Sequence, residues 1–295
     1  MSGLSHVFLL AVIILGAWLA GCVLLGVLAL LPGSKSRVQG LWPLMGSEAV
    51  ILAIGTLPWL LPMPVLGAAL MCAALRIGYE SGVVNGMPGV GASGVLGAGV
   101  LGLVSALIWF LGDDLPLSWV AVLIIGLAFA VVLAKWLAKV WLWRFLIYPA
   151  LPFALFVFFA HRLDAAFVLL LSFLLVEIFD SFSLLGGRLF GKRLLVPKLS
   201  PKKTWEGLLT GQLAVVISAM AMAAILEVNL AMMMVLALVS TAGALAGDLV
   251  ASHAKRRAGV KDYPAVLPIQ GGLLDIMDAW IVAGPLACLA YGVLH

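Results

Sequence analysis

Charged residues are scarce in this chain. Only 10% of the 295 residues are charged, whereas 64% are apolar. Such a composition excludes an ordinary soluble domain, in which about a quarter of the residues are charged. The chain also lacks a long polar stretch, while apolar runs of about 20 residues, enough to cross a hydrocarbon core about 30 Å thick, recur along it. The composition therefore predicts an all-α polytopic membrane protein.

Nine or ten transmembrane helices are expected. The first candidate span carries no cationic flank at its start and is long for the apolar part of a secretory signal, so we expect a retained helix. Three prolines near residues 58–64 favour either a tight hairpin or kinks within a longer element. The candidate spans are 6–31, 43–60, 61–77, 89–112, 117–134, 145–160, 165–181, 206–226, 229–248 and 272–294.

Cysteine is also rare. Cys22, Cys72 and Cys288 fall inside apolar spans, and their spacing does not suggest a metal site. We therefore interpret them as packing residues that carry no information about the redox compartment.

The few cations are concentrated in two windows. Because lysine and arginine gather on the cytoplasmic side of membrane proteins, both windows are expected to face the cytoplasm. The two spans between them form a hairpin whose other turn, at 227–229, carries no cation. With ten spans, both termini lie outside. The windows hold ten of the 17 lysines and arginines: Arg188, Lys192, Arg193, Lys198, Lys202 and Lys203, then Lys255, Arg256, Arg257 and Lys261.

Four aspartates are expected at the same ends of three helices. Carboxylates in membrane helices are costly and call for a partner such as a cation. Asp275 and Asp278, three residues apart at a helix start, point the same way, a spacing that suits a divalent ion such as Mg²⁺. The neighbouring lysines and arginines would then neutralise phosphate oxygens, which predicts a nucleotide or polyphosphate substrate. The four aspartates are Asp180, Asp248, Asp275 and Asp278.

Simpler interpretations exist for each feature. Basic clusters at cytoplasmic helix ends often contact only anionic lipid headgroups. Asp275 and Asp278 could instead stabilise the first turn of a helix. The glycine-rich segment 86–102 is typical of close helix packing.

The window 200–207 reads Ser-Pro-Lys-Lys-Thr-Trp-Glu-Gly and opens a membrane helix. Ser200 or Thr204 can cap this helix, and Glu206 is favourable in its first turn. Two lysines at the positive end of a helix dipole are unfavourable unless an anion joins them. The window is therefore also a candidate phosphate cradle.

These residues carry a resemblance to the phosphatidate cytidylyltransferases, also called CDP-diacylglycerol synthases. Residues 200–207 resemble the second motif of that family, and Asp180 with Gly187-Arg188 and Phe190-Gly191-Lys192 resembles a third. The resemblance covers about residues 176–280. Its main part is similar to the C-terminal signature, in the run Gly247-Asp248-Leu249, Ser252-x-x-Lys255-Arg256, Ala258-Gly259-Val260-Lys261-Asp262, Leu267-Pro268, Gly271-Gly272-x-x-Asp275-x-x-Asp278.

The resemblance implies that CTP and phosphatidate react to give CDP-diacylglycerol and pyrophosphate. It implies Mg²⁺, with a second metal possible, membrane lipids as partners, a homodimer, and an active site facing the cytoplasm of a bacterial inner membrane. Nothing in the sequence is typical of nucleic-acid binding. The resemblance also divides the chain into an N-terminal transmembrane bundle, 1–164, and a C-terminal catalytic region, 165–295, with cytoplasmic motifs at 180–207 and 247–278.

The same resemblance assigns roles to individual residues. The implied metal ligands are Asp180, Asp248, Asp275 and Asp278. The implied catalytic residues are Asp248, Asp275, Lys255, Arg256, Lys261 and Asp262. The implied substrate-binding residues are Ser200, Lys203, Thr204, Gln270, Gly271 and Gly272.

The chain departs from the family pattern near the expected metal. Gln270 stands where the family usually has histidine, and Ile276 replaces an arginine that could bind phosphate. Tyr263-Pro264 stands where Ser-Gly is common. These departures keep open a divergent paralogue that acts on another lipid phosphate or needs a partner. A transporter or non-catalytic scaffold is a third hypothesis, although the sequence shows no internal repeat and its charge is interfacial.

Overall fold

The computed structural model describes residues 3–30, 39–85, 90–111, 126, 140–267 and 270–294. Within these ranges, nine helices are long and apolar enough to cross a membrane. The all-α polytopic prediction is thereby confirmed. The expected span at 117–134 lies outside the described residues apart from residue 126. The nine spans are Val7–Leu30, Trp42–Leu60, Met63–Asn85, Ser93–Leu111, Leu142–Ala160, Ala165–Phe190, Trp205–Ile225, Leu230–Arg257 and Leu273–Leu294.

The first part of the chain forms separate helices. Prolines 58 and 62 end one helix and start the next, so the segment 43–77 contains two helices and not one kinked element. The elements are α1 (Gly3–Leu30), η1 (Gln39–Leu41), α3 (Trp42–Thr56), η2 (Leu57–Leu60), α4 (Met63–Asn85) and α5 (Val90–Leu111).

Glycines allow α4 and α5 to pack closely. A β-carbon added at Gly78 would lie 2.9 Å from the Cα of Ala98, and one added at Gly97 would lie 3.3 Å from the Cα of Gly82. Small residues permit such an approach between membrane helices. Packing thus accounts for glycines in this part of the glycine-rich segment.

The next membrane span contains a break. It consists of α7 (Val140–Phe145), the π-helical turn η4 (Leu146–Ala150) and α8 (Leu151–Ala160). Tyr148 within η4 has extended backbone angles, φ −151° and ψ 122°. Pro149 follows it and cannot donate a backbone hydrogen bond.

The second part of the chain carries longer helices than expected. α9 (Leu163–Phe190) and α11 (Leu230–Arg257) have 28 residues each and continue beyond the apolar spans. Asp180 lies on the first of these continuous helices, and Asp248 and Lys255 lie on the second. The remaining elements are β1 (Leu194–Val196), β2 (Ser200–Thr204), α10 (Trp205–Ile225), α12 (Leu273–Met277) and α13 (Trp280–Leu294).

A short β-hairpin precedes α10. β1 and β2 are antiparallel, with Leu194 opposite Thr204 and Val196 opposite Ser200. Thr204 then caps α10, because its side-chain oxygen accepts a hydrogen bond from the Gly207 amide at 3.1 Å. The lysines of the window 200–207 therefore lie on a strand that leads into the capped helix.

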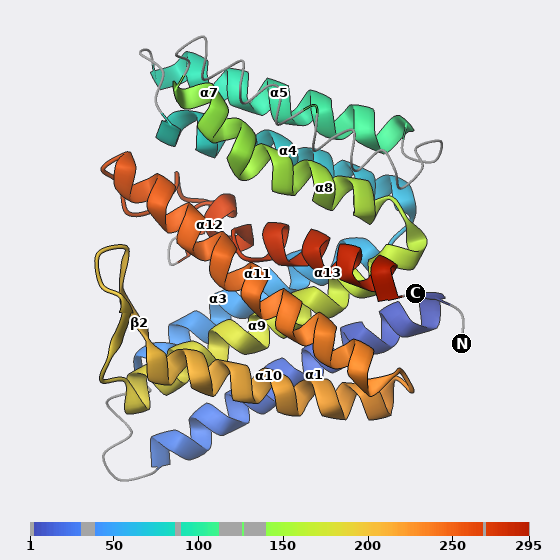
Figure 1. The fold of residues 1–295 in the computed structure, drawn as a ribbon, viewed down its shortest axis with the longest axis vertical. Coiled ribbons are helices and arrows are strands. Elements are labelled where there is room, and N and C mark those ends of the chain that lie inside the picture. The colour runs from blue at the N-terminus through green and yellow to red at the C-terminus, as the bar shows by residue number, and fades with distance from the viewer. Residues whose placement is uncertain are drawn as a thin grey trace.

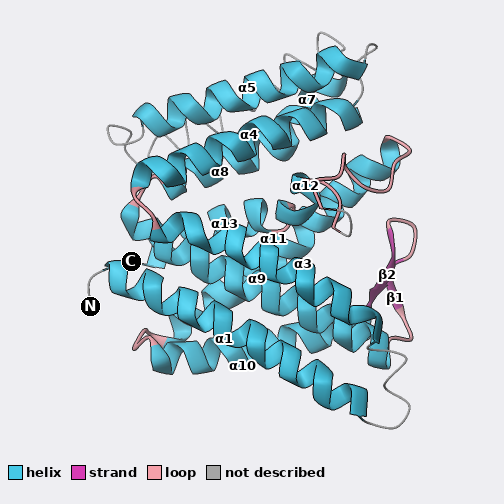
Figure 2. Cartoon of the chain, turned by 180° about the vertical axis from the view of Figure 1, so that it is seen from behind, coloured by secondary structure: helices cyan, strands magenta, loops and turns pink. Residues whose placement is uncertain are grey.

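Most helices run side by side across the molecule (Figure 1). α4, α5, α7 and α8 form one group, and α1, α9, α10, α11 and α13 form the other. The β-hairpin and α12 lie at one end, whereas both termini lie at the opposite end, as the view from behind also shows (Figure 2). Both basic windows thus share one end of the bundle, as expected from the sequence; which side of the membrane this end faces stays a prediction.

An aromatic cluster connects the two groups of helices. The Trp280 ring packs edge to face on Phe156 of α8, with centroids 4.7 Å apart, and lies 4.5 Å from Phe173 of α9. The Trp280 indole N–H donates to the Leu169 carbonyl at 3.0 Å. This buried anchor is the first residue of α13, two residues after Asp278, and holds the start of that helix against α8 and α9. The boundary between two regions at residue 164 stays a prediction. Helices from the two sides of this boundary pack together, α8 on α13 and α1 on α9.

Candidate active site at one end of the helix bundle

A lysine from the β-hairpin pairs with an aspartate from α11. The Lys203 Nζ lies 2.5 Å from Asp248 Oδ2, and the two side chains are 28% and 25% exposed. Burial lowers the pKa of Lys203, but Asp248, followed by Asp180 and Asp278, outweighs burial and raises it above its usual value. Lys203 is therefore a stably charged ammonium with three carboxylates around it.

Asp278 is close to this pair and to a second one. It is only 6% exposed and interacts electrostatically with Asp248, Lys255, Asp180 and Asp275. Gly247 makes the approach possible, because a β-carbon there would lie 3.2 Å from the Cα of Ala279 and closer still to the Asp278 carbonyl. The Gly-Asp pair at 247–248 thus brings α11 against the chain at Asp278.

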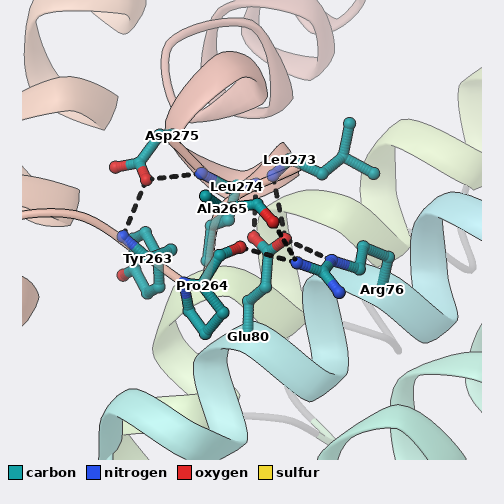
Figure 3. A network of polar contacts seen from close by, with 9 residues as sticks. Arg76, Glu80, Tyr263, Pro264, Ala265, Leu273, Leu274 and Asp275 are labelled. Carbon is teal, nitrogen blue, oxygen red and sulfur yellow. Dashed lines mark hydrogen bonds and ion pairs between the residues drawn. The ribbon is translucent and has the colours of Figure 1, made fainter. Parts of the chain in front are cut away.

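The second pair joins Lys255 of α11 to Asp275 of α12. The Lys255 Nζ lies 2.5 Å from Asp275 Oδ1, and the side chains are 9% and 6% exposed. Asp275 Oδ2 accepts hydrogen bonds from the backbone amides of Tyr263, at 2.7 Å, and Gly272, at 2.9 Å. Both oxygens therefore have donors within the protein, and the carboxylate caps the start of α12 (Figure 3). A role for Asp275 as a metal ligand stays a prediction.

The structure adds two residues that sequence reasoning did not assign to the site. Glu80 of α4 is fully buried, and its carboxylate accepts hydrogen bonds from the amides of Leu273, at 2.9 Å, and Leu274, at 2.7 Å. Arg76, one turn earlier, pairs with Glu80 at 2.6 Å and donates to the Pro264 carbonyl at 2.6 Å. Figure 3 shows both side chains reaching from α4 to the loop that precedes α12. The only available signal was an arginine and a glutamate four residues apart inside an apolar helix.

The glycine pair before α12 fits tightly between these carboxylates. Gly271 has φ +87°, and an added β-carbon would lie 2.5 Å from Asp275 Oδ2. A β-carbon at Gly272 would lie 2.5 Å from Glu80 Oε2 and 2.7 Å from the β-carbon of Tyr263. Gln270 donates from its side-chain amide to the Ser47 hydroxyl at 3.0 Å. Packing explains both glycines; their role and that of Gln270 in binding substrate stay predictions.

Three predicted catalytic residues lie outside the buried cluster. Arg256 is exposed and donates to the Val260 carbonyl at 2.9 Å, which closes the end of α11. Lys261 and Asp262 form a pair at 3.4 Å, with side chains 75% and 53% exposed. Such a solvent-exposed pair contributes little to stability. Contacts of these three residues with a substrate stay predictions.

Lys203 lines a cavity together with other polar and with apolar residues. The volume of this cavity is about 730 Å³, and it lies between α9, β2 and α11. Ser200 and Thr204 line it from the hairpin, and Arg188 adds a second cation. The lining includes Asp180, Ser183, Arg188, Ser200, Lys203 and Thr204. The cavity thus offers hydroxyl and cationic groups suited to phosphate and ribose oxygens.

The carboxylates of the described residues do not form a metal site by themselves. Among the described residues, no three His, Cys, Asp or Glu side chains are grouped closely enough to hold an ion by themselves. Within the cluster, Lys255 and two loop amides hold Asp275. Magnesium commonly takes one or two carboxylates and completes its shell with phosphates and water. Metal binding by the four aspartates stays a prediction.

The chain is similar in sequence to proteins named phosphatidate cytidylyltransferase. The chain is 38% identical over 129 residues to a phosphatidate cytidylyltransferase of Haemophilus influenzae, a match that covers 40% of this chain and 43% of that protein. It is 39% identical over 132 residues to one of Staphylococcus haemolyticus, covering 44% and 50% of the two chains. A relative of the same name in Rickettsia typhi is 30% identical over 196 residues, covering 62% of this chain and 82% of that protein. The chain thus matches half or less of the first two relatives.

The family match extends far beyond the motifs. The sequence model of the cytidylyltransferase family aligns with residues 35–294, which includes α4 with Arg76 and Glu80 as well as both ion pairs. Because this match takes in most of the chain, the protein belongs to the cytidylyltransferase family.

Proposed function

We propose that the protein transfers the cytidylyl group of CTP to phosphatidate and so forms CDP-diacylglycerol and pyrophosphate. The observation that carries the proposal is the two lysine–aspartate contacts near the buried Asp278, at one end of a membrane helix bundle. The family and the names of the three relatives support the same reaction.

The reaction needs charge stabilisation more than proton transfer. A phosphate oxygen of phosphatidate attacks the α-phosphorus of CTP and forms a new P–O bond. The bond between the α-phosphorus and the oxygen that bridges to the β-phosphorus breaks, and pyrophosphate leaves with the electron pair. Since the attacking oxygen is already anionic, no strong general base is required. Lys203 and Lys255 are placed to exchange carboxylate oxygens for phosphate oxygens and to stabilise the negative charge of the transition state.

One or two of Asp180, Asp248 and Asp278 would hold a magnesium ion at this site, together with phosphate oxygens of the substrate. All three interact electrostatically with Lys203, and their oxygens are the hard ligands that magnesium prefers. When bound, the ion would neutralise part of the negative charge of the phosphates. Asp275 orients Lys255 and the loop at 263–272 through its two oxygens.

An apolar cavity beside α12 supports the proposal that the substrate is a lipid. This cavity of about 400 Å³ is lined by Ile54, Cys72, Arg76, Phe173, Ile276 and Trp280, among others. Ile54 and Cys72 are exposed on α3 and α4, so the cavity borders the surface that faces the hydrocarbon. We propose that an acyl chain of phosphatidate occupies it. Ile276, which replaces an arginine of the family pattern, makes this lining apolar, while Arg76 supplies a guanidinium from another helix.

The proposal is tested by turnover of the purified protein. In detergent with Mg²⁺, the protein should form CDP-lipid and pyrophosphate from CTP and phosphatidate, and Asp248→Asn should lower kcat/KM by at least about 100-fold. Glu227→Gln is the control, because Glu227 lies in the turn between α10 and α11 at the opposite end of the bundle. Absence of turnover by folded wild-type protein, with a known active relative tested beside it, would reject phosphatidate as acceptor. Turnover with a different lipid phosphate would then favour the divergent-paralogue hypothesis, which Gln270 and Ile276 motivate.

The proposal also includes the membrane in which the protein resides and the side that the site faces. The protein is an integral membrane protein by its nine described spans. We place it in a bacterial inner membrane because the three relatives are bacterial, and we place the site on the cytoplasmic side because the basic windows lie at that end.

A further inference from the structure

Two tyrosine hydroxyls are buried beside the carboxylates and have no hydrogen-bond partner among the described residues. Tyr148 is 5% exposed and Tyr263 is 2% exposed. Buried polar groups in proteins are nearly always paired, since an unpaired one loses its hydrogen bonds to water without replacement. Two such hydroxyls next to one cluster therefore point to a ligand.

The protein holds both side chains without using their hydroxyls. The Tyr263 amide donates to Asp275 Oδ2, and its ring lies 5.4 Å from the Lys255 Nζ. Tyr148 lies at the break in η4, where its backbone is extended. Irregular backbone at membrane depth is tolerated where it is buried in protein or lines a cavity. Both phenol groups are thus fixed by their backbones and rings, and each hydroxyl remains available.

The two hydroxyls border the same group of acids. Tyr148 interacts electrostatically with Asp278, Tyr263, Asp248 and Asp275. Tyr263 interacts with Asp278, Asp275 and Glu80. Burial, together with these carboxylates, raises the pKa of Tyr263 well above its usual value, so its hydroxyl keeps its proton at every working pH.

The nearby lysines, unlike the two tyrosine hydroxyls, already have partners in the described part of the protein. Lys203 and Lys255 are each paired with an aspartate, whereas the phenol groups have no partner in the described part of the chain. We propose that Tyr148 and Tyr263 donate hydrogen bonds to an anionic phosphate oxygen of the substrate bound at Asp278. The inference rests on the proposed function and adds two substrate contacts to it. Tyr263 belongs to one of the departures from the family signature, so this contact is a feature of this chain.

Removal of the hydroxyls tests the inference. Tyr148→Phe and Tyr263→Phe keep the ring and its packing, and each should lower kcat/KM by about 10-fold, as expected for loss of a hydrogen bond to a charged group. Because an unpaired buried hydroxyl is removed, the Tm of the ligand-free protein should stay unchanged or rise. A larger KM for CTP would assign the oxygen to the nucleotide, and a larger KM for phosphatidate would assign it to the lipid. Tyr79→Phe, at an exposed position on α4, is the matched control.

Unchanged kinetics in both variants would overturn the inference. So would a lower Tm without a change in kcat/KM, because that result assigns the hydroxyls a structural role. If wild-type protein forms no CDP-lipid, binding of inorganic pyrophosphate with Mg²⁺, measured by calorimetry, decides separately. Binding that is lost in the double variant but kept in Tyr79→Phe would support the phosphate contact while rejecting the proposed reaction. Equal binding by wild type and double variant, or none by wild type, would overturn the contact as well.

Discussion

At the scale of single residues, the sequence predicted which charged residues lie in one polar region. It did not predict which lysine pairs with which aspartate. The sequence placed Asp248, Asp275, Lys203 and Lys255 in one polar region, and the structure joins them as two pairs. Which lysine meets which aspartate depends on where the β-hairpin lies relative to α11, and motif spacing along the chain carries no such information. For the same reason Arg256 and Lys261, which lie in the same motif as Lys255, are exposed while Lys255 is buried.

The Lys203–Asp248 pair gives a prediction about pH. Lys203→Met should lower the free energy of unfolding at neutral pH by about 2 kcal/mol, because Asp248 loses its charged partner. The pKa of Lys203 is raised in the folded protein. The contribution of the pair is therefore fully present below the unfolded pKa, about 10.4, and is lost as the pH rises through the higher folded-state pKa. Denaturation of both proteins between pH 7 and 11 would measure this, with the exposed Lys198→Met as control. A difference that stays constant to pH 11 would contradict it.

At the scale of elements, hydrophobic runs predicted the membrane helices well and their ends poorly. α9 and α11 continue as helix through polar residues to Phe190 and Arg257, because helix formation does not stop where the apolar run stops. The hairpin β1–β2 was missed, since the polar sequence of β2 lacks the alternation of apolar residues that indicates a strand. The capping role of Glu80 was also hidden, because the carboxylate and the amides it binds are almost 200 residues apart.

The link between α4 and α12 gives a prediction about these elements. Glu80→Gln should destabilise the protein by about 3 kcal/mol, because it leaves Arg76 without its partner and weakens the acceptor for two buried amides. It should also lower kcat, since the loop that carries Asp275 loses its support from α4. Chemical denaturation of Arg76→Gln, Glu80→Gln and the double variant forms a thermodynamic cycle. A double variant whose loss equals the sum of the single losses would show that the two residues are not coupled.

At the scale of the whole molecule, α12 separates a polar compartment from an apolar one. Asp275 and Asp278 belong to the charged cluster, whereas Ile276 and Met277 line the apolar cavity. A lipid phosphate needs both environments at once, since its headgroup is anionic and its acyl chains are apolar. Composition predicted a membrane protein, and the two basic windows predicted charge at one end. The apolar compartment depends on seven elements packing together and has no signal in any single segment.

This arrangement predicts how a narrower cavity would affect the substrate. Ala69 lines the cavity on α4, whereas the adjacent Ala68 is exposed and does not. Ala69→Phe should raise the KM for long-chain phosphatidate by about 10-fold, because the new ring displaces methylene groups that are each worth about 0.8 kcal/mol when buried. The KM for CTP and the KM for a short-chain phosphatidate should change little. Ala68→Phe adds the same ring to the neighbouring position on the same helix, so an equal rise in that variant would show that the acyl chain does not enter the cavity.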